Sequence, residues 1–287
     1  MKIQVAAHSG FCFGVKKAVE TALKAAEDFE GRRIYTYGPI IHNHQVTAYL
    51  ESRGIRIVED LEQVPGEIVI VRSHGVAKGF YDQAAALNIR VIDTTCPYVR
   101  KVQQLAMKHH AAGCRVVIIG DADHPEVIGI NGWTDFTARV EKTAEGLEDL
   151  RHEPKLCFVA QTTLSLAVWR AVTEKVKDFS GDVLLFNTIC AATEERQKEC
   201  EELASKVDLM IVIGGKHSSN TQKLYQIAAR NCRNAIHIEN ASELLMNLNG
   251  KYDNIGITAG ASTPDWIIKE VIEQLENEGE VIVNDER

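Results

Sequence analysis

The sequence lacks any apolar run near the roughly 20 residues that a membrane-spanning helix needs, so it predicts no membrane span. It has no excess of basic residues either, because 32 Lys and Arg stand against 40 Asp and Glu and give a net charge of -8. That balance argues against a nucleic-acid binder, although an anionic substrate needs only a local site. The first five residues already read as a strand, with no signal or transit segment ahead of them. We therefore expect a cytoplasmic protein.

Short Cys-x-x-Cys pairs, the usual sign of a zinc site, are also missing, although the chain has seven cysteines. A reducing compartment disfavours a disulfide framework. Four cysteines lie in apolar or amphipathic segments and are predicted to be small buried side chains: Cys114, Cys157, Cys200 and Cys232. The other three, Cys12, Cys96 and Cys190, stand in a repeated context.

One pattern recurs three times along the chain. Residues 91–96 and 185–190 each run from an apolar strand through a polar turn residue and Thr to a cysteine, and Cys12 follows a strand at 3–7. Each cysteine is followed by a helical pattern, at 15–26, 99–111 and 193–207. A strand that ends at Gly comes next in each copy, and a histidine follows it within a few residues: His42, His124 and His217. A third strand then ends in a polar turn, at 73–75, 161–163 and 260–262.

Strands that alternate with helices in this way predict parallel sheets with helices outside them. The fold class is therefore α/β, a three-lobed trefoil of pseudo-threefold-related parallel units. The predicted boundaries are 12–95 for lobe one, 96–189 for lobe two and 190–280 for lobe three. Residues 1–11 and 281–287 are predicted as terminal strands that complete the ring. Residues 281–285 resemble the strand that precedes Cys96 but lack its cysteine. The N-terminal strand before Cys12 fills this role instead, so the two termini are expected to lie close together.

Ligands of parallel sheets bind outside the carboxyl ends of the strands, which is where every polar motif of the repeat falls. Three lobes that face one axis bring three thiols together. An iron–sulfur cubane suits threefold geometry and leaves one iron without a protein ligand. Zinc held by three cysteines with a histidine or water is the second interpretation, and three unrelated structural cysteines are the third. The spacing alone leaves all three open.

Residues 214–221 follow a strand and begin a helix, and their glycines, hydroxyls and helix amides suit a phosphate group. The alternative is an ordinary N-capped helix. His42 and His74 are expected to donate hydrogen bonds to the same anion. Glu126, which follows His-Pro, is the candidate general acid, whereas Asp121 and Asp123 are interpreted as an exposed acidic loop.

Nine segments, spread in order over essentially the whole chain, resemble the signatures of one family. They are GFCFGV (10–15), GPIIHN (38–43), RSHGV (72–76), DTTCP (93–97), HPEV (124–127), QTTLS (161–165), NTIC (187–190), HSSN (217–220) and GASTP (260–264). The family is 4-hydroxy-3-methylbut-2-enyl diphosphate reductase, the LytB type. The resemblance implies a trefoil around one central [4Fe-4S] cluster, held by Cys12, Cys96 and Cys190 and leaving an open apical iron.

The resemblance also implies the reaction. It is the reductive dehydroxylation of (E)-4-hydroxy-3-methylbut-2-enyl diphosphate to isopentenyl and dimethylallyl diphosphate, the last step of the non-mevalonate isoprenoid route. Glu126 would be the proton donor, with His124 and Thr162 beside the substrate hydroxyl. The remaining substrate-binding residues would hold the diphosphate: His42, His74, Ser218, Ser219, Asn220 and Ser262.

The implied electron donor is a ferredoxin or flavodoxin. We expect a monomer or weak homodimer that binds neither nucleic acid nor a membrane. Two functions of other classes compete with the reductase: a cluster-bearing sensor without turnover, and a zinc hydrolase of a phosphorylated substrate. A sensor does not need the acid–hydroxyl pair of Glu126 and Thr162.

Overall fold

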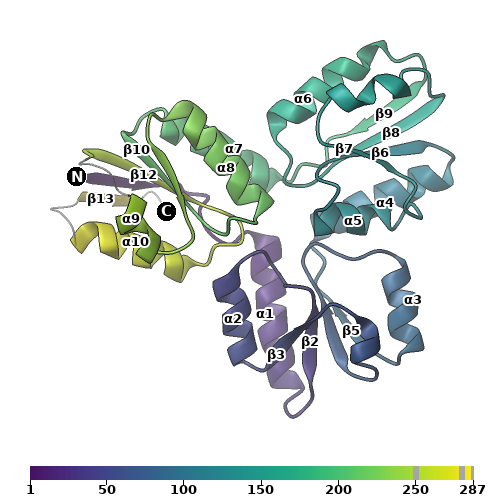
Figure 1. The fold of residues 1–287 in the computed structure, drawn as a ribbon, viewed down its shortest axis with the longest axis horizontal. Coiled ribbons are helices and arrows are strands. Elements are labelled where there is room, and N and C mark those ends of the chain that lie inside the picture. Colours follow the sequence, from purple (N-terminus) through teal and green to yellow (C-terminus); the bar gives the residue numbers. More distant parts are fainter. Residues whose placement is uncertain (248–251, 278–281, 286–287) are drawn as a thin grey trace. The chain divides into compact units, whose positions relative to one another are not determined.

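The computed structural model describes residues 1–247, 252–277 and 282–285, and its helices and strands are shown in Figure 1. The chain divides into two compact units. The first unit comprises Met1–Val15, His42–Val46 and Ala191–Arg287, and the second comprises Lys16–Ile41 and Thr47–Cys190. Three parallel sheets form the framework, and each sheet lies wholly within one unit.

Sheets one and two, both in the second unit, have the same strand order. Sheet one contains, in spatial order, β3 (Ile55–Val58), β2 (Ile34–Tyr37), β4 (Ile68–Val71) and β5 (Arg90–Asp93). Sheet two contains β7 (Arg139–Glu141), β6 (Arg115–Ile119), β8 (Lys155–Ala160) and β9 (Asp182–Phe186). The first strand along the chain therefore lies second in each sheet, and the strand that leads to a cysteine lies at the edge.

Sheet three, in the first unit, repeats this order and adds a fifth strand. It contains β11 (Ala235–Ile238), β10 (Leu209–Ile213), β12 (Asn254–Ala259), β1 (Lys2–Val5) and β13 (Ile282–Asp285). The N-terminal strand β1 thus holds the place of β5 and β9, as predicted. β13 pairs with it in parallel, with Lys2 opposite Ile282, so the strands nearest the two termini are neighbours. The prediction of three parallel α/β lobes is confirmed.

A long helix follows each cysteine of the repeat: α1 (Phe13–Asp28), α4 (Pro97–Ala111) and α7 (Ala191–Ala204). All three begin two residues before the predicted starts, because the apolar pattern becomes visible only at the first buried turn. α7 also ends at Ala204, three residues short of its predicted end.

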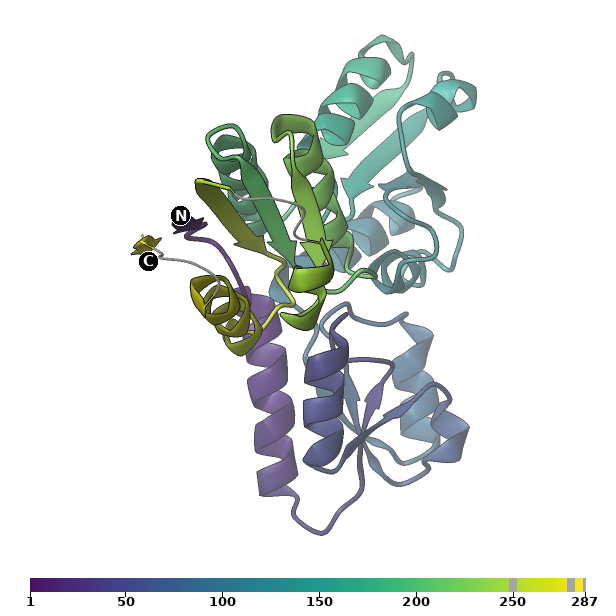
Figure 2. The same ribbon diagram turned by 60° about the vertical axis from the view of Figure 1, so that its left-hand side comes forward.

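The helix after a cysteine covers the next sheet. Val102 and Ala106 of α4 pack into the core cluster of β6 and β8 in sheet two. Cys200 and Leu203 of α7 pack into a cluster with β10 of sheet three. Figures 1 and 2 show α1 lying alongside α2 (His44–Ser52), which flanks sheet one. The chain therefore passes from one sheet to the next at each cysteine.

The remaining elements complete the layers. The shorter helices are α3 (Gly79–Ala86), α5 (Pro125–Asn131), α6 (Leu166–Lys175), α8 (Ser219–Asn231), α9 (Ser242–Asn247) and α10 (Asp265–Asn277), and the 3-10 turns are η1 (Leu61–Gln63), η2 (Glu145–Leu150) and η3 (Val176–Asp178). The inner strands β4 and β10 are buried along their whole length, as expected for parallel sheets covered on both faces. Among the described helices, none combines the length and apolar character that crossing a membrane requires.

The predicted lobe boundaries remain a prediction. The sheets follow 12–95, 96–189 and 190–280 in order, but contacts group the chain into two units rather than three. Residues 278–281 and 286–287 at the predicted C-terminal boundary lie outside the described residues.

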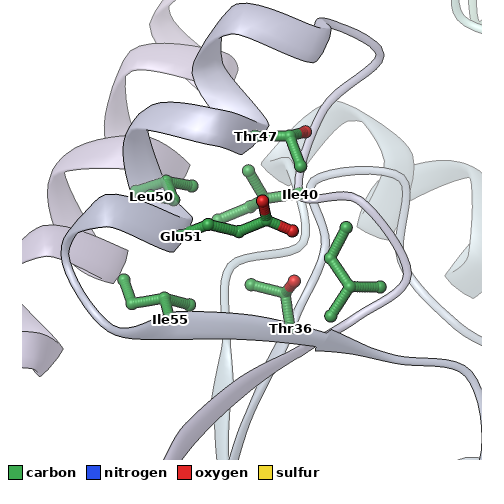
Figure 3. A pocket seen from close by; sticks show the side chains of 7 residues that line it. Thr36, Ile40, Thr47, Leu50, Glu51 and Ile55 are labelled. Atoms are coloured by element: carbon green, nitrogen blue, oxygen red, sulfur yellow. The ribbon is translucent and has the colours of Figure 1, made fainter.

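A small depression lies in lobe one, which is sheet one with its helices. Thr36, Thr47 and Glu51 face it together with apolar residues that include Ile40 and Leu50 (Figure 3). None of the predicted site residues lines it, so the candidate site lies elsewhere.

Candidate active site

The three cysteines of the repeat occupy equivalent positions in the three sheets. Each lies directly before the first residue of a helix and is half-buried. Each backbone N–H also donates a hydrogen bond to the turn after the third strand of its sheet: Cys96 to Ser73 (3.0 Å), Cys190 to Thr162 (3.0 Å) and Cys12 to Ala261 (3.2 Å). The repeat inferred from sequence therefore extends to individual hydrogen bonds, whereas the meeting of the three thiols stays a prediction.

This position suits a thiolate that binds a metal. The N-terminal amides of a helix favour negative charge on the residue that precedes them. Of the remaining cysteines, Cys157, Cys200 and Cys232 are buried as predicted. Cys114 is half-buried, so the prediction for it was wrong; it directly precedes β6 and lies at the amino end of that strand. Burial raises the pKa of the Cys157 and Cys200 thiols to about 12, which keeps them protonated. Cys12, Cys96 and Cys190 are the cysteines that follow the carboxyl end of a strand and directly precede a helix, one for each sheet, which fits a group bound by three thiolates.

Glu126 is a buried carboxyl group in the first turn of α5, with only 2% of its surface exposed. Its Oε1 accepts a hydrogen bond from the Thr162 backbone N–H, and its Oε2 accepts one from the Thr162 hydroxyl, both at 2.6 Å. Burial raises the pKa of Glu126 to about 7, although the two Thr162 hydrogen bonds oppose the shift. A carboxyl group with this pKa can hold and release a proton near neutral pH.

His124 is the N-cap residue of α5. Its Nδ1 accepts a hydrogen bond from the Glu126 backbone N–H at 3.1 Å, so Nδ1 carries no proton in this arrangement. The neutral ring then carries its proton on Nε2, where it can donate to a ligand. The ring of His74 meets that of His124 edge to face, with centroids 5.4 Å apart. The structure thus brings Glu126, Thr162, His124 and His74 together in the second unit.

The other predicted substrate-binding residues gather in the first unit. Ser218 is the N-cap of α8, where its hydroxyl accepts a hydrogen bond from the Thr221 backbone N–H at 3.4 Å. The Ser262 hydroxyl donates to the His42 carbonyl oxygen at 3.3 Å and lies 3.4 Å from the Ser218 hydroxyl. All three contacts are longer than usual hydrogen bonds, which are about 2.9–3.0 Å for N–H···O and about 2.7–2.8 Å for O–H···O, so both hydroxyls are loosely held and can turn toward a ligand.

Asn220, in the first turn of α8, is the clearest sign of a ligand. It is 4% exposed, and neither its side-chain nitrogen nor its oxygen has a hydrogen-bond partner among the described residues. An unsatisfied buried amide costs about 1–3 kcal/mol, which a polar ligand would offset. Ser219, the first residue of the helix, is half-buried. The α8 N-terminus therefore fits a bound anion such as a diphosphate.

The turn before α8 depends on glycine. Gly214 has φ +142°, which side chains rarely adopt, and a Cβ on Gly215 would lie 2.7 Å from the His42 carbonyl oxygen. Two residues that sequence reasoning missed support this turn. His237 lies with its Nε2 2.8 Å from the Gly214 carbonyl oxygen, and Glu239 accepts a hydrogen bond from the Lys216 backbone N–H at 2.6 Å. In the sequence, the one indication of their role is that both lie at the end of a predicted strand.

Fold and site together define a three-lobed α/β protein with one cysteine at the carboxyl edge of each sheet, a buried carboxyl group and a helix N-terminus whose buried side chains fit an anion. Residues 3–276 match the family described as LytB protein. The chain belongs to this family.

Several relatives share nearly the whole chain. The 4-hydroxy-3-methylbut-2-enyl diphosphate reductase of Alkaliphilus oremlandii is 49% identical over 96% of this chain and 100% of its own length. The enzyme of the same name from Thermoanaerobacter sp. is 48% identical over 96% of each chain.

Two solved structures are also similar. One is described as (E)-4-hydroxy-3-methyl-but-2-enyl diphosphate reductase, the terminal enzyme of the non-mevalonate pathway. It is 39% identical, covers 96% of this chain and 99% of its own, and has a TM-score of 0.71. The other is E-1-hydroxy-2-methyl-but-2-enyl-4-diphosphate reductase from Plasmodium falciparum. It is 29% identical, covers 99% of this chain and 92% of its own, and has a TM-score of 0.89.

Proposed function

We propose that this chain is a reductase of 4-hydroxy-3-methylbut-2-enyl diphosphate in the non-mevalonate isoprenoid pathway. Two relatives that carry this name match 96% of the chain at 49% and 48% identity. The reaction breaks the carbon–oxygen bond of the substrate hydroxyl and consumes two electrons and two protons. Water leaves, and isopentenyl or dimethylallyl diphosphate forms.

Thr162 carries the proposal, because one residue joins the proposed acid to a proposed metal ligand. Its hydroxyl and backbone N–H both bind the Glu126 carboxyl group. Its carbonyl oxygen accepts the hydrogen bond from the Cys190 backbone N–H. The proposed proton donor and a proposed cluster ligand are thus connected through one residue. This arrangement suits a reaction that delivers electrons and protons to the same substrate.

The LytB family is one of iron–sulfur enzymes. We propose that Cys12, Cys96 and Cys190 hold one [4Fe-4S] cluster and leave its apical iron open. Once bound, the cluster supplies the electrons and a Lewis-acidic iron at the site.

The side chains of this protein do the binding and the proton transfer. Ser218, Ser219, Asn220, Ser262 and His42 bind the diphosphate at the α8 N-terminus, with His74 as a further donor. Glu126 holds a proton near neutral pH and releases it through the Thr162 hydroxyl to the departing oxygen. His124 donates from Nε2 to the same oxygen and keeps it oriented.

The partners follow from this chemistry. A small one-electron carrier, ferredoxin or flavodoxin, supplies the reducing electrons. We propose a monomer or weak homodimer, and the cytoplasmic location stays a prediction.

The test is anaerobic purification followed by a reductase assay with the diphosphate substrate and a chemical reductant. The wild-type protein should be coloured, contain iron, and change its absorption spectrum when substrate is added. Glu126→Gln should keep the cluster spectrum and the substrate response but lose most of its turnover, because Gln is similar in shape and carries no acidic proton.

Two outcomes would contradict the proposal. A colourless, iron-free protein with full activity would exclude the cluster. Full turnover in Glu126→Gln would exclude the role of Glu126 as the acid.

A further inference from the structure

The loop that carries Cys12 differs from the loops that carry the other two cysteines. Only residues 94–95 separate β5 from Cys96, and only residues 187–189 separate β9 from Cys190. Six residues, 6–11, separate β1 from Cys12. A longer loop has more conformations to lose when its cysteine is held in place.

The two short loops are held by their own side chains. Asp93 Oδ1 accepts from the Thr95 backbone N–H at 2.8 Å, and the Thr94 hydroxyl donates to the Val71 carbonyl oxygen at 2.5 Å. The loop before Cys190 repeats both contacts: Asn187 Oδ1 accepts from the Ile189 backbone N–H (3.1 Å), and the Thr188 hydroxyl donates to the Ala160 carbonyl oxygen (2.5 Å). By strand register, Ala7 stands at the position of Asp93 and Asn187 and has no side-chain acceptor, and His8 stands at the position of the two threonines.

Two charged side chains of α7 bind the Cys12 loop from outside. Glu199 accepts from the backbone N–H groups of Ala7 (2.5 Å) and His8 (2.9 Å), one on each carboxylate oxygen. Arg196, only 5% exposed, donates through one terminal nitrogen to the Gly10 carbonyl oxygen at 2.6 Å. Hydrogen bonds with a charged partner are about twice as strong as neutral ones.

Arg196 and Glu199 together form a clamp. The clamp holds the loop at Gly10, whose backbone conformation favours glycine. Gly10 has φ +85°, and a Cβ there would lie 2.8 Å from Asp265 Oδ1. Cys12 follows two residues later. α7 itself begins at the residue after Cys190, so the helix that starts at one cysteine fixes the loop that leads to another.

We propose that Arg196 and Glu199 are positioning residues that hold the Cys12 loop in its metal-binding conformation. This inference rests on the proposed function, which makes Cys12 a cluster ligand. Neither side chain touches the substrate or cluster in this role. They act through the backbone of residues 7–10, and they replace the side-chain contacts that the other two loops supply for themselves.

The experiment compares Glu199→Ala with the control Glu195→Ala on the same helix. Glu195 is 54% exposed and lies 3.7 Å from His8 Nε2, and among the described residues it has no hydrogen bond to the backbone of the Cys12 loop. In metal-free protein, the alkylation rates of Cys12, Cys96 and Cys190 are measured separately by peptide mass spectrometry with iodoacetamide. In holoprotein, the rate of iron release to a chelator is measured for the same variants.

Glu199→Ala should accelerate alkylation of Cys12 by about tenfold, as expected for loss of charge-assisted hydrogen bonds, and leave Cys96 and Cys190 unchanged. Iron release from the holoprotein should also be faster. Glu195→Ala should match the wild type in both assays. Glu199→Gln keeps one acceptor oxygen, so its rates should lie between those of the wild type and Glu199→Ala. This variant is used for the comparison if Glu199→Ala does not fold.

Equal alkylation of Cys12 in Glu199→Ala and Glu195→Ala would overturn the inference. So would equal acceleration at all three cysteines, because that result means general destabilisation. A wild-type protein that binds no iron would instead contradict the proposed function, and the alkylation rates would still report on the clamp.

Discussion

At the scale of single residues, Glu126 combines burial with a fixed pair of hydrogen bonds. Burial disfavours the ionised carboxylate, and the two Thr162 donors favour it. Burial is the larger effect, so the pKa rises from its ordinary value of 4.5 to about 7 instead of falling. The same side chain therefore reacts to pH both in catalysis and in folding.

Glu126→Gln should change how stability depends on pH. Below pH 4.5 the carboxyl group is protonated in both folded and unfolded chains. Between pH 4.5 and 7 only the unfolded chain ionises, so the wild-type protein loses stability as pH rises through this window. Gln does not titrate. The stability of the variant relative to wild type should therefore increase by about 2 kcal/mol between about pH 5 and pH 8.

Urea unfolding of both proteins at each pH measures this difference, with metal-free protein used throughout. Glu153→Gln serves as the control, because that carboxylate is partly exposed and pairs with Arg115 at the surface. A relative stability of Glu126→Gln that does not change with pH would show that the carboxyl group has an ordinary pKa.

The sequence identifies Glu126 as the candidate acid, but it does not reveal the pKa of the carboxyl group. Its place after His-Pro and the family resemblance single it out, whereas the raised pKa depends on burial that local sequence does not encode. The unsatisfied amide of Asn220 is a similar case, since a helix-capping run such as 217–220 looks the same with or without a ligand.

At the scale of elements, α5 is a seven-residue helix that places the acid, and its N-cap is an unusual histidine. Asn caps a helix well and has an oxygen close to the position of Nδ1, whereas Ala has no acceptor. His124→Asn should therefore keep the stability of the wild type. His124→Ala should lose about 1 kcal/mol.

Both variants should lose activity, because neither has the Nε2 donor. Urea unfolding measures the capping effect, and the reductase assay measures the donor. If His124→Asn is as unstable as His124→Ala, the histidine stabilises α5 in some way other than capping.

The sequence predicts where helices lie better than it predicts which face of a helix is buried. All three helices after the cysteines were expected, with starts displaced by two residues. The clamp was missed because α7 buries polar residues, including Arg196 and Gln197, at helical spacing with Cys200 and Ala204. In a single sequence, a buried helix face made of polar side chains resembles an exposed one. The spacing of the residues therefore identifies the helix but not the segment that it contacts.

At the scale of the whole molecule, the division into two units predicts separate local stabilities. Ile3 in β1 and Ile118 in β6 are both fully buried, one in each unit. Replacing either with Ala should cost about 3 kcal/mol. In Ile3→Ala, hydrogen exchange should increase in β10 and β12 but not in β6 and β8, and Ile118→Ala should show the reverse.

Hydrogen exchange followed by mass spectrometry measures both variants against wild type. Equal acceleration in all three sheets would mean that the chain unfolds as one cooperative unit.

The repeat made the three sheets predictable from sequence, because strand, cysteine and helix recur at regular spacing. The last strand was predicted too, but its parallel pairing with β1 and the two-unit grouping were not predictable in the same way. They depend on long-range pairing and packing, which no short segment specifies.

The position of β1 between β12 and β13 has a consequence for biosynthesis. Sheets one and two use only residues 34–93 and 115–186, so all their strands have been made well before the chain is complete. β1 leaves the ribosome before every other described strand, yet its partner β12 begins at Asn254. Among the described strands, β1 is therefore synthesised before the others and is one of the last to pair, so this strand, with Ile3 and Val5 on its buried face, stays unpaired until β12 has been translated.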